Sequence, residues 1–87
     1  MGYTVVFSQA FERQLLRLVG KNPQLEGRVR KAVKQLQKDV RHPSLRLHEL
    51  SGVSNWSASV TRDIRIILHI EGGTLFLTRS GSHNGVY

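Results

Sequence analysis

The sequence predicts an α+β domain in which a helical hairpin packs on one face of a small, mainly antiparallel sheet. Apolar residues recur every three or four positions over residues 11–40, which is the spacing of amphipathic helices. The period changes to two at residues 3–7 and again over residues 45–79, which indicates strands with one buried face. The predicted order is β-α-α-β-β-β-β, and residues 1–87 are expected to form a single domain because a chain of this length buries one modest core.

The first strand and the first helix are predicted from residues 3–20. Residues 3–7 have the alternation of a short strand. Ser8 is a favourable N-cap residue, and the apolar stripe from Phe11 to Leu18 has helical spacing. Gly20 is expected to close this helix, because glycine is common just beyond a helix C-terminus.

The second helix is predicted to begin at Asn22-Pro23, a capping residue followed by a first-turn proline. It is expected to end at His42-Pro43, because the residue before a proline avoids the helical region. Its polar face is basic and carries Arg30, Lys31, Lys34, Lys38 and Arg41.

Four strands are predicted after the second helix. Gly72-Gly73 is a strong signal for a two-residue hairpin turn between the last two of them. Trp56 is expected to anchor the core, because the residues that alternate with it are apolar. The predicted strands cover residues 45–48, 56–61, 64–71 and 74–79.

The net charge of +7, from thirteen Lys and Arg against six Asp and Glu, indicates a phosphate-rich or strongly acidic partner. Seven bases and one acid fall between Arg28 and His48. A solvated helix face explains this cluster as well as nucleic-acid contact does, whereas the excess over the whole chain favours nucleic acid. The candidate RNA-binding residues are Arg30, Lys31, Lys34, Lys38, Arg41, Arg46, Arg62 and Arg79.

Several classes of site are not expected. There is no cysteine, no zinc-binding spacing and no phosphate-binding glycine loop, so neither a metal nor a cofactor is predicted. No apolar run approaches the length of a membrane span, and no export signal is recognisable. The expected location is the cytoplasm.

Candidate catalytic residues fall on the strands. Alternation places Arg46 and His48 on one face of their strand and Arg65 opposite the apolar side of its own. If the helices cover the apolar face, these three side chains project from the other face, where His83 and Tyr87 could meet them. We expect Arg65 to be exposed there; the alternative is an ion pair with a nearby acid, Glu71 or Asp63. His42 and His69 are interpreted as surface or satisfied polar residues.

Two imidazoles around one guanidinium suit metal-independent RNA cleavage. One imidazole removes the proton of the 2′-hydroxyl, the arginine stabilises charge on the phosphate oxygens, and the second imidazole protonates the leaving 5′-oxygen. The unperturbed histidine pKa of about 6.5 allows one ring to be neutral and the other charged near neutral pH. The products would be a 2′,3′-cyclic phosphate and a 5′-hydroxyl.

Taken together, the helical hairpin, residues 45–52 before Trp56, residues 62–67 and residues 81–87 resemble the RelE/ParE superfamily of bacterial toxin-antitoxin toxins, nearest its RelE and YafQ-like branch. The resemblance runs nearly end to end. It implies a ribosome-dependent mRNA endonuclease, or mRNA interferase, that acts in the 30S decoding site. It also implies an acidic antitoxin as inhibitor, and operator DNA as a partner only through the antitoxin complex.

The same resemblance implies roles for five positions. His48 falls where relatives carry a proposed general base, and Asp63 is a second candidate for that role. Arg65 matches the phosphate-stabilising arginine, His83 the proposed general acid, and Tyr87 an aromatic residue that orients the substrate nucleotide.

One position departs from the YafQ-like pattern, because Ser59 stands where those toxins can carry a further histidine. Two other functions stay open. ParE-like members of the superfamily act on DNA gyrase instead of RNA, and a third possibility is an inactive member that only binds antitoxin.

Overall fold

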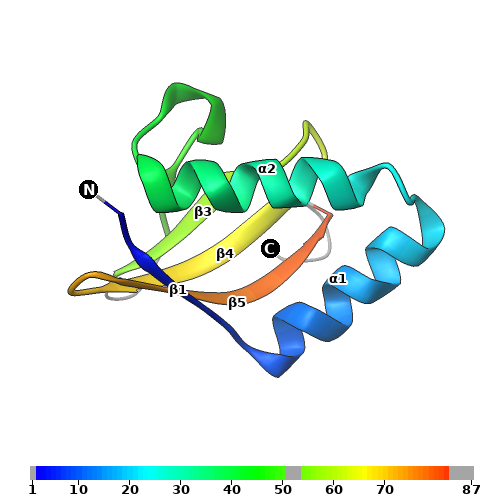
Figure 1. The fold of residues 1–87 in the computed structure, drawn as a ribbon, viewed down its shortest axis with the longest axis horizontal. Helices are drawn as coiled ribbons and strands as arrows, with labels where there is room; N and C mark the ends of the chain where they lie inside the picture. The colour runs from blue at the N-terminus through cyan, green and yellow to red at the C-terminus, as the bar shows by residue number, and fades with distance from the viewer. Residues whose placement is uncertain (1, 51–53, 83–87) are drawn as a thin grey trace.

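Two α-helices lie on one face of a five-stranded sheet in the computed structural model, which describes residues 2–50 and 54–82 (Figure 1). The strand order is β1-β5-β4-β3-β2. The predicted α+β class and the order β-α-α-β-β-β-β are confirmed, with one turn of 3-10 helix added. The elements are β1 (Thr4–Phe7), α1 (Gln9–Lys21), α2 (Leu25–Lys38), η1 (Pro43–Leu45), β2 (His48–Glu49), β3 (Asn55–Ser59), β4 (Ile64–Glu71) and β5 (Thr74–Ser82).

The sheet is antiparallel except where β1 joins it. β2, β3, β4 and β5 pair with one another in antiparallel fashion, whereas β1 pairs in parallel with β5, so that Val5 stands opposite Leu75. The β4–β5 hairpin turns at Gly72-Gly73 as predicted, and Gly72 has a φ of 58°, which glycine adopts without a steric penalty. No helix in the described ranges is long and apolar enough to cross a membrane.

The helix α1 begins as predicted. The Ser8 hydroxyl accepts a hydrogen bond from the Phe11 amide at 2.9 Å and donates one to the Thr78 carbonyl, also at 2.9 Å, so the cap also ties the helix to β5. The helix runs one residue past Gly20, and Asn22 is its C-cap. The predicted start of the second helix at Asn22-Pro23 is therefore wrong, because Asn22 already closes the first one.

The segment after α2 differs from the prediction. The helix α2 ends at Lys38, before the predicted His42-Pro43, because Asp39 adopts an extended conformation as its C-cap. The His42 ring then caps a 3-10 turn by accepting from the Ser44 amide at 3.2 Å. Arg46 has a φ of 45°, in the left-handed region, so the predicted strand over residues 45–48 is reduced to β2.

The hydrophobic core lies between the helices and the sheet. α1 packs along β5 and α2 crosses the sheet on the same side (Figure 1). Trp56 is half-buried and packs against this core, as expected for an anchor. The buried cluster comprises Phe11, Ala32, Leu36, Val40, Leu45, Ala58, Ile66, Leu68, Leu75 and Leu77.

The opposite face of the sheet, called the open face below, carries polar side chains beside the apolar Ile67. Strand pairing places His48, Ser57, Ile67 and Arg79 side by side in one row across β2, β3, β4 and β5. Arg65 lies two residues before Ile67 on β4, so alternation puts it on the same face.

Candidate functional site

Arg65 is the centre of a hydrogen-bonded cluster on the open face. Its Nε donates to the Ser57 hydroxyl at 2.6 Å, and its Nη2 donates to the Arg46 carbonyl at 3.1 Å. The same Nη2 lies 3.3 Å from His48 Nδ1. The sequence prediction that Arg65 and His48 meet on this face is therefore confirmed.

Arg65 is buried, however, with only 9% of its surface exposed, so the expected exposed position is wrong. The expected alternative, pairing with Glu71 or Asp63, is also wrong. Neither of the two ion pairs among the described residues, Glu26–Arg30 and Glu71–His69, includes Arg65. Burial is tolerated because a hydroxyl, a carbonyl and an imidazole replace water as acceptors.

Among the described residues no carboxylate pairs with Arg65, and this affects what its guanidinium can bind. The acceptors of the described hydrogen bonds to Arg65 are uncharged, so its positive charge is not neutralised within the described part of the chain. A guanidinium with uncharged acceptors and little water attracts a phosphate more strongly than a solvated one does. The cluster is therefore suited to binding an anion.

Strand register explains how these side chains meet. Ser57 is paired with His48 on one side and with Ile67 on the other, and Arg65 is diagonal to it across β3 and β4. Across β5, Arg65 stands opposite Gly81, which has no side chain to fill the space beside it.

Ser57 is the site residue that the sequence analysis missed. Its side chain is fully buried, at 0% exposure. The sequence does contain a signal for Ser57. It is a small polar residue between Trp56 and Ala58, two apolar residues whose side chains point to the other face.

Arg46 contributes its backbone rather than its side chain. The carbonyl of this residue, which has the left-handed conformation, accepts from Arg65, and the residue also lines a separate pocket with Arg41, His42 and Trp56. The prediction that the Arg46 and His48 side chains project together from one strand face is therefore wrong, since Arg46 precedes β2.

Asp63 lies elsewhere. It belongs to the turn between β3 and β4, where its amide donates to Thr61 Oγ1 at 3.3 Å. It lines a pocket with Asn22, Leu25 and Arg28 at the start of α2. This pocket does not include His48 or Arg65.

His83 and Tyr87 lie outside the described residues. The last described residue, Ser82, pairs with Ile64, so β5 runs to the end of β4 that carries Arg65. The two histidines that were interpreted as surface or satisfied polar residues have partners. His42 contacts Ser44 at 2.8 Å, and His69 lies 3.4 Å from Glu71. This confirms both as satisfied polar residues.

The candidate RNA-binding residues are spread over several surfaces. Arg79 shares the open face with Arg65, because a bulge between Ile67 and Leu68 inverts the alternation of β5. The exposed bases of α2 lie in the helix layer, across the sheet from Arg65: Arg30, Lys31, Lys34 and Lys38. Arg41 and Arg62 are exposed in connections.

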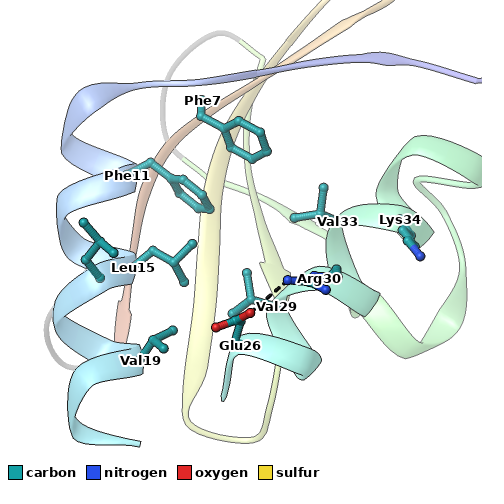
Figure 2. Close-up of a pocket in the computed structure, with 10 residues that line it drawn as sticks. Phe7, Phe11, Leu15, Val19, Glu26, Val29, Arg30, Val33 and Lys34 are labelled. Atoms are coloured by element: carbon teal, nitrogen blue, oxygen red, sulfur yellow. Dashed lines mark hydrogen bonds and ion pairs between the residues drawn. The ribbon is translucent and has the colours of Figure 1, made fainter. Parts of the chain in front are cut away.

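A second concave surface is apolar and lies between the two helices (Figure 2). This groove has a volume of about 360 Å³ and is lined by α1 on one side and α2 on the other, together with Phe7 of β1. Its rim is charged: Arg30 pairs with Glu26 at 2.8 Å, and Lys34 lies one turn further along α2. The apolar lining consists of Phe7, Phe11, Leu15, Leu16, Val19, Val29 and Val33.

The groove was not predicted, because helical periodicity marks these side chains as core without showing that the helices diverge. Leu16 at its edge is 73% exposed. As for metal binding, no cluster of three or more His, Asp or Glu residues is present among the described residues.

The fold is that of the RelE/ParE-type toxins. A chain of the *Escherichia coli* DinJ-YafQ toxin-antitoxin complex aligns with a TM-score of 0.81 and 16% identity, over 100% of this chain and 99% of that one. YafQ from *E. coli* alone gives a TM-score of 0.80 and 16% identity over 98% of each chain.

A third solved structure, a YoeB/ParE toxin from *Agrobacterium tumefaciens*, has a TM-score of 0.79 and 12% identity over 92% of this chain and 98% of that one. No family model and no curated protein sequence matches the chain. The fold that the resemblance to the RelE/ParE superfamily implies is thus confirmed.

Proposed function

We propose that this protein is the toxin of a toxin-antitoxin pair and a metal-independent endoribonuclease that cleaves mRNA on the ribosome in the cytoplasm. The observation that carries the proposal is the buried Arg65 with uncharged acceptors and an imidazole 3.3 Å away. The fold shared with YafQ and with a YoeB/ParE toxin supports the toxin part of this proposal.

In the proposed reaction the 2′-hydroxyl attacks the adjacent phosphorus and the 5′-oxygen leaves, giving a 2′,3′-cyclic phosphate and a 5′-hydroxyl. Arg65 stabilises the charge that develops on the phosphate oxygens. His83 protonates the leaving oxygen, and Tyr87 orients the nucleotide. His48 and Asp63 are the two candidates for accepting the 2′-hydroxyl proton.

The test is to map RNA 5′ ends after induction of the parental protein, Arg65→Ala and His83→Ala. We expect new 5′-hydroxyl ends within messages, and a decrease of about 10²-fold or more in cleavage for each variant. Parental rates in both variants would show that the site is misassigned. Gyrase-dependent DNA breakage with intact message would instead support the ParE-like alternative, and absence of toxicity the inactive one.

The partner is proposed to be an acidic antitoxin whose amphipathic helix occupies the groove between α1 and α2. A helix buries its apolar side in such a groove, and acidic residues beside it complement Arg30 and Lys34 at the rim. The DinJ-YafQ complex shows that a chain of this fold occurs in a toxin-antitoxin complex.

This partner is tested by Leu16→Glu, which places a charge at the exposed edge of the groove with little effect on the core. We expect antitoxin affinity to fall about 10-fold or more, as judged by calorimetry with the product of a neighbouring acidic reading frame. Gln9→Glu adds the same charge to α1 outside the groove and serves as the control. Equal affinities for the two variants would rule out this groove.

A further inference from the structure

Two hydrogen bonds fix the plane of the Arg65 guanidinium. Nε donates to the Ser57 hydroxyl at 2.6 Å, and Nη2 donates to the Arg46 carbonyl at 3.1 Å. A guanidinium is planar, so two nitrogens held in this way fix the position of the third. Ser57 is fully buried and Arg65 nearly so, and water therefore competes little with these contacts.

The contact with His48 then determines which ring nitrogen carries hydrogen. A guanidinium only donates hydrogen bonds, so His48 Nδ1, 3.3 Å from Arg65 Nη2, must be the acceptor. An accepting nitrogen carries no hydrogen, and the neutral ring must have its proton on Nε2. Protonation of Nδ1 would bring two N–H groups and two positive charges together.

We propose that Ser57 is a positioning residue for Arg65, and that the positioned Arg65 holds His48 as a neutral Nε2–H hydrogen-bond donor. Within the proposed nuclease, on which this inference rests, Nε2 donates to a phosphate oxygen as negative charge grows there. His48 thus stabilises charge without transferring a proton, in place of the general-base role that the resemblance implies. Removal of the 2′-hydroxyl proton then falls to water, because Asp63 lines a pocket that does not include His48 or Arg65.

The first test does not depend on nuclease activity. Nitrogen-15 NMR of the histidine rings in the full chain is expected to show His48 as the Nε2–H tautomer. Ser57→Ala should produce a mixture of tautomers, whereas Ser59→Ala should not, because the Ser59 hydroxyl donates to the Thr61 carbonyl and not to Arg65. An Nδ1–H tautomer in the parental protein, or an unchanged tautomer in Ser57→Ala, would overturn the assignment.

The second test separates donation from proton transfer. Glutamine keeps a donor and an acceptor but cannot take up a proton, so His48→Gln should lose no more than about 10-fold in cleavage where His48→Ala loses about 10²-fold. Ser57→Ala should lower kcat by about 10-fold with little change in KM. Equal losses for Gln and Ala would restore the general-base role.

Nuclease activity and the positioning of Arg65 by Ser57 are tested separately. If the parental protein cuts no message, the proposed function is wrong, while the NMR result still decides whether Ser57 positions Arg65 and fixes the tautomer of His48.

Discussion

At the scale of single residues, the burial of Arg65 was the feature that strand alternation could not show. Alternation correctly gave the face on which Arg65 lies. It could not show that the left-handed Arg46 would turn a carbonyl toward the guanidinium, or that Ser57 would accept from it. These contacts depend on register between strands, which a single sequence does not fix.

Arg65→Lys is expected to lose almost as much cleavage activity as Arg65→Ala. A single ammonium cannot reproduce the contacts of Nε and Nη2, and it leaves buried acceptors without donors. We expect cleavage to fall about 10²-fold and the free energy of unfolding to fall by about 1–3 kcal/mol.

Single-turnover cleavage of ribosome-bound mRNA and urea denaturation measure these two effects. Arg17→Lys is the matched control, because Arg17 is exposed on α1. A lysine variant with parental turnover would mean that a positive charge at this position is sufficient for cleavage.

At the scale of elements, the sequence was most informative where capping chemistry is local. The Ser8 cap and the Gly72-Gly73 hairpin follow from the types of the residues involved. The end of α2 does not follow from the residue types, because the helix stops at the Asp39 cap and a 3-10 turn comes before the strand. The bulge at Ile67/Leu68, which decides the face of Arg79, has no sequence signal that we recognise.

The Ser8 hydroxyl is expected to contribute more than an ordinary cap. Ser8→Ala removes both the bond from the Phe11 amide and the bond to the Thr78 carbonyl, so we expect a loss of about 2 kcal/mol in the free energy of unfolding. Urea denaturation measures it, with Gln9→Ala, exposed one position later, as control. A loss of unfolding free energy equal to that of the control would show that neither hydrogen bond stabilises the fold.

The left-handed Arg46 makes a second prediction for the connection between α2 and β2. Arg46→Gly should raise the free energy of unfolding by up to about 1 kcal/mol, since glycine adopts this conformation without strain. Arg46→Val should lower it by about 1 kcal/mol or more. Thermal denaturation distinguishes the two, and stabilisation by valine would contradict the assigned backbone conformation.

At the scale of the whole molecule, the layers of the fold separate two charged surfaces. The bases of α2 and the Arg65 cluster lie on different sides of the sheet. Composition predicted a polyanionic partner but could not show this separation, because it arises from packing of the helices on one face only.

For the proposed nuclease, we therefore expect ribosome affinity and turnover to be separable. Lys31→Ala and Lys38→Ala should each weaken ribosome binding and reduce the slope of log affinity against log salt by about one, with unchanged cleavage once bound. Binding measured across a salt series tests this, with Lys21→Ala on α1 as the control. Equal salt slopes for all three variants would place the ribosome contact elsewhere.

The parallel pairing of β1 with β5 also affects how the chain is made. Residues 4–7 pair with residues 74–77, and the Ser8 hydroxyl donates a hydrogen bond to the carbonyl of Thr78, 70 positions later. A nascent polypeptide cannot complete its sheet edge until β5 has emerged from the exit tunnel. Folding should therefore finish only after residues 74–78 have left the tunnel, which would give the proposed antitoxin, if already present, time to engage before the folded toxin exists.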